Sequence, residues 1–192
     1  MRTCPTQSAL ADGAVHEMSG RMDDAALIGL GTNLPFADVA GPALLAHALA
    51  ALEARGLAPL AVSSVWLTGA WPPSDQPDYH NAAAAVDPQG LSPQALYAVL
   101  SEVEQAFGRE RRARWEARTL DLDLLGIGSL KGDFDGIRIP HPRLHERAFV
   151  LAPLAEIAPD WLCPGLGKTP VELLAAVPEG QSLRRLGPLA PF

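Results

Sequence analysis

The sequence predicts a single α/β domain in which short β-strands alternate with α-helices. Four runs have the length and apolar character of strands, and two longer stretches repeat their apolar residues at helical spacing. The chain has 192 residues, of which 48% are hydrophobic, so it can bury one substantial core. These observations place residues 25–192 in one domain.

The composition argues against several classes of function. A formal net charge of −7 disfavours a general binder of nucleic acid or anionic membranes, which would favour a positive surface. Cys4 and Cys163 are too few for a disulfide framework, so we expect a reducing compartment. No apolar run is long enough to span a bilayer, and residues 1–24 lack the features of a signal peptide. We therefore expect a cytoplasmic protein.

Residues 1–24 are expected to form a disordered extension, because they show no sustained period and contain many small or polar residues. Met18 and Met22 stand near the end of this stretch. Translation from either methionine is a hypothesis that the intact mass of the native protein would test.

The first half of the domain is expected to contain two strands separated by a helix. An alanine- and leucine-rich stretch follows Pro42, which suits the opening turn of a helix, and Gly56 suits its end. Val65 and Trp66 are strand formers in the next apolar run. We expect a strand at residues 25–31, a helix at residues 43–55 and a strand at residues 60–67.

A proline-rich loop leads into the third expected strand. Residues 68–78 contain three prolines, which disfavour both helix and sheet interior. If residues 79–86 form a strand, Tyr79 and Asn81 lie on one face, where a ring and an amide suit a flat heteroaromatic ligand. The alternative is that Tyr79 belongs to the core and Asn81 caps a loop.

A second helix is expected from Ser92 onward. Ser92 suits the N-cap and Pro93 the first helical position. Apolar residues then recur at helical spacing up to Phe107, and Glu104 falls near the helix end.

The most informative stretch is residues 108–125, GRERRARWEARTLDLDLL. It holds five of the chain's fifteen basic residues and then alternates apolar with acidic positions, as a two-faced strand does. Asp121 and Asp123 fall on the same face of that strand, where paired carboxylates suit Mg²⁺, and guanidinium groups suit phosphate oxygens. The alternative is an arginine-rich helix end before an edge strand whose aspartates face water.

The remaining part of the chain carries weaker signals. A turn or hairpin is expected at residues 126–136, and an apolar helix at residues 147–154. Pro142 suits the start of a short helical turn, with His141 at its N-terminal edge. Gly167-Lys168-Thr169 lacks the first glycine and the preceding strand of a P-loop, so we reject a Walker motif.

Five stretches of the chain resemble the 6-hydroxymethyl-7,8-dihydropterin pyrophosphokinases, a family of folate-pathway enzymes. The similarity runs from about Ala25 to Asp160, and its most specific part is the R-W-x-x-R-T-L-D-L-D string that begins at Arg114. The stretches are residues 26–34, 63–66, 75–82, 108–125 and 139–143.

The resemblance implies a ferredoxin-like fold, an antiparallel sheet covered by helices on one face. It implies transfer of the terminal pyrophosphate of ATP to the hydroxymethyl group of the reduced pterin, with release of AMP. Asp121 and Asp123 would hold two Mg²⁺ ions between the triphosphate and the attacking hydroxyl. The resemblance also implies a monomer.

The resemblance further implies substrate contacts. Arg109 and Arg118 match catalytic loop arginines that close over the phosphates. The implied pterin contacts are Thr68, Tyr79, Asn81 and Phe149, with Tyr79 and Phe149 on the two sides of the ring. The other implied ATP contacts are Glu104, Arg111, Arg112, Trp115, His141 and Arg147.

The chain departs from the family pattern in two loops. Glu116-Ala117 replaces the usual Gly-Pro, and Thr68-Gly69-Ala70 replaces the usual Thr-Pro-Pro, followed by the unusually large Trp71. We expect slower closure of the arginine loop or weaker nucleotide affinity, a more flexible start of the pterin loop, and retained activity.

Two other functions compete with this interpretation. A ferredoxin-like nucleic-acid-binding module would explain the arginines, but it would not explain the paired aspartates, and no strand has the aromatic pattern of an RNA-recognition domain. A catalytically silent relative would serve as an interaction domain. Filter binding to RNA tests the nucleic-acid-binding module. Magnesium-dependent ATP binding distinguishes the catalytically silent relative from an enzyme.

Overall fold

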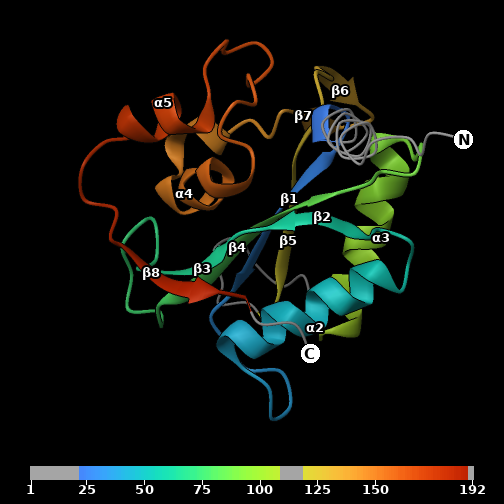
Figure 1. Cartoon of the computed structure of the whole chain (residues 1–192). Helices are drawn as coiled ribbons and strands as arrows, with labels where there is room; N and C mark the ends of the chain where they lie inside the picture. The colour runs from blue at the N-terminus through green and yellow to red at the C-terminus, as the bar shows by residue number, and fades with distance from the viewer. Residues whose placement is uncertain (1–21, 109–118, 190–192) are drawn as a thin grey trace, which may run out of the picture.

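The computed structural model describes residues 22–108 and 119–189 (Figure 1). The described strands form a six-stranded sheet and a separate two-stranded sheet. The strands are β1 (Ala26–Thr32), β2 (Pro59–Val62), β3 (Ser64–Thr68), β4 (Tyr79–Val86), β5 (Asp121–Ile127), β6 (Gly132–Phe134), β7 (Ile137–Ile139) and β8 (Leu183–Pro188). The helices are α2 (Gly41–Glu53), α3 (Pro93–Ala106), the 3₁₀ helix η1 (Leu144–Glu146), α4 (Ala148–Ile157) and α5 (Pro170–Ala175).

The main sheet is antiparallel, as the family resemblance predicts. Its strand order is β5-β1-β4-β3-β8, and β2 also pairs with β4. β1 lies between β5 and β4, so that Gly31 stands opposite Asp121 on one side and Asn81 on the other. The strand that carries the two aspartates is therefore an edge of the sheet, one strand away from Asn81.

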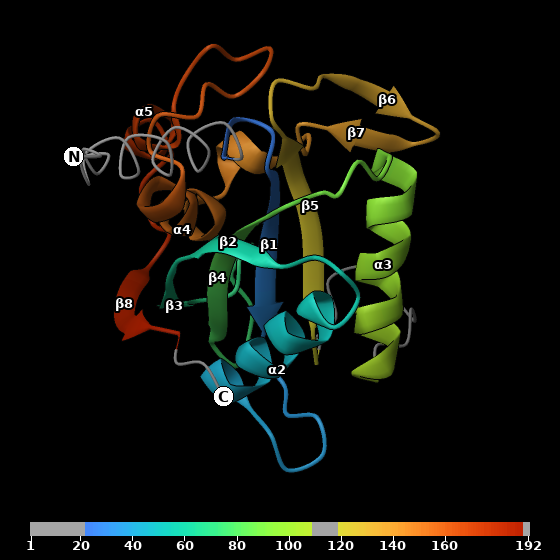
Figure 2. The same ribbon diagram turned by 45° about the vertical axis from the view of Figure 1, so that its right-hand side comes forward.

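Helices pack on both faces of the sheet, so the prediction that they cover one face only is wrong. α2 and α3 pack on one face and build a core cluster with Ile28 of β1. α4 and α5 pack on the other face and build a second cluster with Leu27. Figures 1 and 2 show the two helix pairs on opposite sides of the sheet. The physical reason is that β4 is buried on both faces from Asn81 to Val86, so each face needs a cover.

The expected helices form where the sequence places their ends. The hydroxyl of Ser92 accepts a hydrogen bond from the Ala95 amide at 3.2 Å, and Pro93 opens α3. Gly41 and Pro42 begin α2 slightly earlier than expected. Thr169, which mimics the end of a P-loop, instead caps α5 through a reciprocal pair of bonds with Glu172.

The strand expected at residues 60–67 is divided into β2 and β3. Ser63 interrupts it, and its hydroxyl accepts from the Ala83 amide at 2.9 Å while donating to the Ser64 carbonyl at 2.7 Å. The hydroxyl thus accepts one bond from β4, while the Ser63 amide still donates to the Ala83 carbonyl at 2.9 Å. The register with β4 shifts between Val62 and Trp66.

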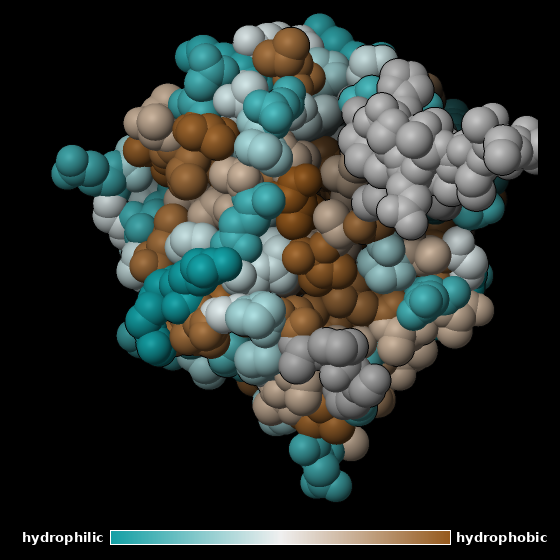
Figure 3. Space-filling model, in the orientation of Figure 1, coloured by the Kyte–Doolittle hydropathy of each residue, from teal (hydrophilic) through white to brown (hydrophobic). Residues whose placement is uncertain are grey.

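The hairpin expected at residues 126–136 lies further along the chain, as β6–β7 at residues 132–139, and the apolar helix expected at residues 147–154 forms as α4. α5 and β8 were not expected. β8 pairs with β3 and exposes Arg184 and Arg185. On the face shown in Figure 3, hydrophilic residues gather over β8, whereas hydrophobic groups lie in patches between α4 and β2.

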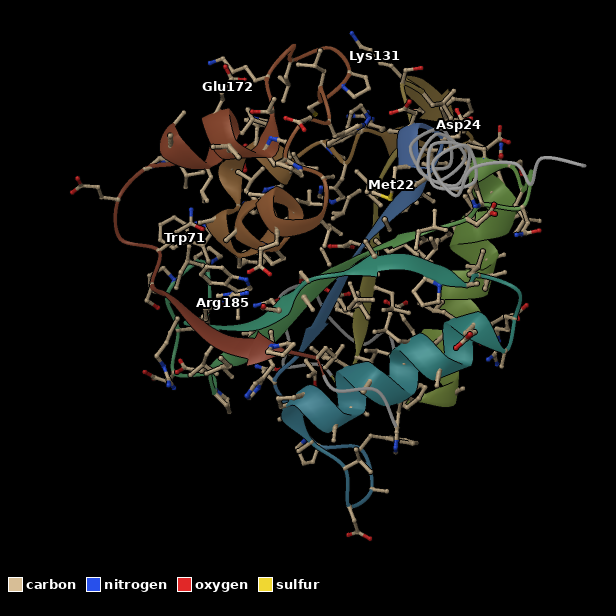
Figure 4. All side chains as sticks on the ribbon, in the orientation of Figure 1. Met22, Asp24, Trp71, Lys131, Glu172 and Arg185 are labelled. Carbon is tan, nitrogen blue, oxygen red and sulfur yellow. The ribbon has the colours of Figure 1, made fainter. Side chains whose placement is uncertain are left out.

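Met22 marks the start of the described fold. It packs against the second core cluster, beside the beginning of β1 (Figure 4), and its carbonyl accepts from the Ala25 amide at 3.2 Å. Residues 22–24 therefore contact the domain, and the predicted extension stays a prediction for residues 1–21, which lie outside the described residues. Among the described helices, none has the length and apolar character needed to cross a membrane.

Candidate active site

A cleft of about 720 Å³ opens between the sheet, the start of α4 and the loop after β3. It brings together seven residues that the sequence assigns to metal or substrate. These residues come from three strands, β3, β4 and β5, and from the start of helix α4. They are Thr68, Tyr79, Asn81, Asp121, Asp123, Arg147 and Phe149.

The two aspartates present carboxylates side by side on the cleft face of β5. Leu122 and Leu124 point into the first core cluster, so the period of two leaves Asp121 and Asp123 on the opposite face. Nη1 of Arg147 lies 3.3 Å from Oδ2 of Asp123, whose side chain is 35% exposed. The guanidinium group therefore compensates part of the charge that the paired carboxylates concentrate.

This donor set fits Mg²⁺. Both groups supply hard oxygen ligands, and Mg²⁺ usually takes one or two carboxylates while substrate phosphates and water complete its shell. Within the described residues there is no group of three or more histidine, cysteine or acidic side chains that would form an all-protein metal cage. The site is thus suited to an ion that arrives with a phosphorylated ligand.

The floor of the cleft holds a buried amide. Nδ2 of Asn81 donates to the hydroxyl of Thr68 at 2.8 Å, and both residues are almost fully buried. Gly31 lies beside them on β1, and a Cβ there would stand 3.1 Å from Oδ1 of Asn81. The absent side chain at Gly31 therefore leaves the space in which this amide is held.

Two aromatic rings line the same cleft. The hydroxyl of Tyr79 donates to Oε1 of Gln76 at 2.8 Å, which fixes the ring from the loop side. Phe149 comes from the first turn of α4, and the guanidinium carbon of Arg147 lies 5.7 Å from its ring centroid. Tyr79 and Asn81 both line the cleft, as expected for two residues on one face of the strand, and the binding of a flat ligand stays a prediction.

His141 lies near the site but does not line the cleft. Burial, followed by the neighbouring Arg147 and Arg143, lowers the pKa of His141 to about 4. Its ring is therefore neutral at pH 7. Nδ1 accepts from the Arg143 amide at 3.2 Å, so the proton of the neutral ring is on Nε2, which can donate to an anion.

Glu104 also lies outside the cleft lining. It is buried at the end of α3, and its Oε1 accepts from the Leu122 amide at 2.7 Å. This bond holds the start of β5 and thereby the backbone between the two aspartates. The nucleotide contact expected for Glu104 stays a prediction.

The arginine loop falls outside the described residues. The roles expected for Arg109, Arg111, Arg112, Trp115 and Arg118, and the effect of the departure at Glu116-Ala117, concern residues 109–118 and stay predictions. Of the basic residues named for phosphate contacts, Arg147 is the one within the described part of the chain, and it lines the cleft.

The cleft includes residues that the sequence did not single out for the site. Gln76 links Tyr79 to Asn33, whose Nδ2 donates to Oε1 of Gln76 at 3.3 Å. Arg143 lines the cleft from the turn before η1. Their only sequence signal is that they stand within the family-like stretches 75–82 and 139–143.

The cleft thus brings paired carboxylates together with a buried amide and two aromatic rings. The family model described as 7,8-dihydro-6-hydroxymethylpterin-pyrophosphokinase (HPPK) matches residues 27–159. The chain belongs to this family, whose reaction is pyrophosphoryl transfer in folate biosynthesis with ATP as co-substrate. It is therefore a pyrophosphokinase.

Curated relatives agree over most of the chain. It is 42% identical over 155 residues to a 2-amino-4-hydroxy-6-hydroxymethyldihydropteridine pyrophosphokinase of Synechocystis, covering 79% of this chain and 75% of the relative. Enzymes of the same name from Pseudomonas aeruginosa and Methylorubrum extorquens are 43% identical over 119 residues and 40% over 141 residues. These matches cover 62% and 73% of this chain, and 72% and 86% of the two relatives.

Two solved structures share the fold. They are Plasmodium falciparum HPPK-DHPS with pteroate, with a TM-score of 0.59 and 12% identity, and HPPK-DHPS in complex with substrates, with a TM-score of 0.58 and 14% identity. Each covers 79% of this chain, which spans only 44% and 43% of their length. At such low identity the likeness supports the fold alone.

Proposed function

We propose that the cleft transfers pyrophosphate from ATP to the hydroxymethyl group of 6-hydroxymethyl-7,8-dihydropterin. The observation that carries the proposal is the meeting of Asp121 and Asp123 with Tyr79, Asn81 and Phe149 in one cleft. The hydroxymethyl oxygen attacks the β-phosphorus, the bond from that phosphorus to the α,β-bridging oxygen breaks, AMP leaves, and the hydroxyl proton is released.

The pterin is placed by the ring-binding half of the cleft. Tyr79 and Phe149 contact the two faces of its ring, and Asn81, held by Thr68, bonds its edge. A buried, pre-oriented amide favours a ring with matching donors and acceptors, because a ligand without them leaves polar groups unpaired.

The phosphates are placed by the charged half. Asp121 and Asp123 would hold two Mg²⁺ ions in this proposal, and the positive charge of these ions would lower the repulsion between the triphosphate and the attacking oxygen. Arg147 lies against Asp123 and is available to the phosphates, and neutral His141 offers its Nε2–H. Arg109 and Arg118, with Arg111, Arg112 and Trp115, complete the nucleotide site in this proposal.

The test is AMP release from ATP and Mg²⁺, with and without the pterin, for the wild type and Asp123→Ala. We expect AMP that depends on the pterin and falls by at least about 100-fold in the variant, because phosphoryl transfer relies on the metal for charge stabilisation. Asp133→Ala, on the exposed hairpin strand β6, is the matched control. Folded protein without pterin-dependent AMP release would contradict the proposal.

Further properties belong to the same proposal. We expect a monomer in the cytoplasm that binds neither nucleic acid nor membranes, with ATP and the pterin as its partners. We also propose the ferredoxin-like description of the fold. It is supported by the order β1-α2-β3-β4-α3-β5, the sheet order β5-β1-β4-β3 and the placement of α2 and α3 on one face, with α4, α5 and β8 as additions.

A further inference from the structure

The chain between α5 and β8 lines a small recess that shares Phe149 and residues 68–71 with the cleft, although it lies beyond the residues matched by the family model. Residues 180–183 line a small recess of about 30 Å³ together with Phe149 and residues 68–71. In Figure 1 this segment runs down from α5 to β8 and passes the loop after β3.

Gln181 supplies the missing cap of α4. The N-cap residue of this helix, Arg147, makes no side-chain cap bond. Instead the Ala148 amide donates to Oε1 of Gln181 at 2.9 Å, and Nε2 of Gln181 donates to the Glu146 carbonyl at 2.8 Å. One side chain thus satisfies an orphan amide of the helix and holds the peptide units on both sides of Arg147.

The peptide units that Gln181 holds flank Arg147, and Phe149 follows two residues later in the first turn of α4. Arg147 reaches Asp123 at 3.3 Å, and its guanidinium group lies over the Phe149 ring. Because the directions of these side chains follow from the backbone at the helix start, an unfixed backbone there would loosen both.

Ser182 acts in the same way on the opposite wall. Its hydroxyl accepts from the Gly69 amide at 3.0 Å, next to Thr68, and a Cβ at Gly69 would lie 3.1 Å from that hydroxyl oxygen. Two adjacent residues therefore hold both sides of the part of the cleft that would bind the ring. Ser182 holds the loop after β3, and Gln181 holds the start of α4.

We propose that Gln181 is a positioning residue for the pyrophosphokinase reaction, with Ser182 as its counterpart on the loop side. Gln181 sets the orientation of Phe149 and Arg147 toward the pterin and the metal carboxylates without touching either substrate. This inference rests on the proposed function, since it concerns the same cleft.

The first test compares Gln181→Ala with Gln94→Ala. Gln94 lies on α3, outside the cleft, and its side chain donates a hydrogen bond to Asp135. For Gln181→Ala we expect the KM for the pterin to rise about three- to tenfold, as one or two lost hydrogen bonds imply. Gln94→Ala is expected to keep the wild-type KM. A wild-type KM in Gln181→Ala would overturn the proposal.

A double-mutant cycle separates positioning from general stability. If Gln181 acts through Phe149, then adding Gln181→Ala to Phe149→Ala raises the pterin KM by less than about twofold, because the group being positioned is gone. Additive effects would show that Gln181 does not act through Phe149 and would overturn its proposed role toward the pterin. Should Gln181→Ala not fold, Gln181→Glu replaces it, since it keeps the acceptor for Ala148 and loses the donor to Glu146.

Pterin binding without turnover distinguishes this inference from the proposed function. Quenching of pterin fluorescence gives the dissociation constant with a non-hydrolysable ATP analogue and Mg²⁺. If the wild type binds pterin but releases no AMP, the proposed reaction fails, while a three- to tenfold weaker Gln181→Ala complex still supports the positioning role. Equal dissociation constants in an active wild type and in Gln181→Ala overturn the positioning role alone.

Discussion

At the scale of single residues, the space beside Asn81 is set by a glycine. Gly31 and Gly29 lie two residues apart on the same face of β1, but their surroundings differ. A Cβ at Gly31 would stand 3.1 Å from Oδ1 of Asn81, whereas one at Gly29 would meet Leu125 at an ordinary 3.4 Å. The two positions thus form a natural pair for testing the amide.

We expect Gly31→Ala to weaken pterin binding by about 1 kcal/mol, roughly fivefold in KM, because the Asn81 amide must move away from Thr68. Gly29→Ala carries the same change of backbone freedom and is expected to keep the KM. Steady-state kinetics with varied pterin at saturating ATP measures both. An equal rise in KM in the two variants would mean that strand distortion, and not the amide, causes the effect.

The residue scale also shows what the sequence can predict about the site. The common face of Asp121 and Asp123 was predictable, because the period of a strand is a local property. The contacts of Gln181 were not, since they join residues 33 and 35 positions apart in a segment without any motif. Long-range side-chain hydrogen bonds of this kind produce no periodic pattern in the sequence.

At the scale of elements, α4 is tied to the sheet by one carboxylate. Glu156 accepts from the Ser64 amide at 2.9 Å, from Nε1 of Trp66 at 2.9 Å and from Nε of Arg185 at 3.0 Å. Burial raises the pKa of Glu156, but these hydrogen bonds outweigh it and lower the pKa below its ordinary value of 4.5. The ionised form is thus favoured by folding.

We expect Glu156→Gln to lower the free energy of unfolding by about 1–3 kcal/mol at pH 7, because three donors lose a charged acceptor. A depressed pKa contributes stability above the unfolded value of 4.5, and this contribution is lost as the pH falls through the folded pKa. The difference between wild type and variant should therefore shrink below pH 4.5 in urea titrations. Glu53→Gln, at an exposed position at the end of α2, is the control, and a difference independent of pH would contradict the role of the charge.

Elements differ in how well the sequence predicts them. α3 was predictable because its cap, its proline and its apolar period agree. β8 was not, because its residues are mostly exposed and it exists by pairing with β3, which propensity does not report. The division at Ser63 likewise depends on a side-chain bond to another strand.

At the scale of the whole molecule, the sheet separates two cores, and the cleft lies where one of them ends. At the end of this face that lies toward β7, Leu27 of β1 and Leu125 of β5 belong to the second core cluster. On the same face, β1 then offers Gly29 and Gly31, and β5 offers Asp123 and Asp121, where the cleft begins. The apolar half of this face thereby anchors α4, and the other half remains open for substrates.

The same core defines where the domain begins. Met22 packs against the second cluster, and Asp23 approaches Gly128, where a Cβ would stand 2.7 Å from the Asp23 carbonyl oxygen. The sequence predicts an extension before this point, so two variants test the boundary. One is the chain that starts at Met22, and the other is Met22→Ala in the full-length chain.

We expect the chain that starts at Met22 to keep the stability and turnover of the full chain, within about 0.5 kcal/mol. Met22→Ala should lose about 1–2 kcal/mol, because a partly buried apolar side chain is removed from the core. Urea unfolding and pterin-dependent AMP release measure the two effects. If the shortened chain loses as much stability as Met22→Ala, residues 1–21 contribute to the fold, and the domain boundary lies further toward the N-terminus than the sequence predicts.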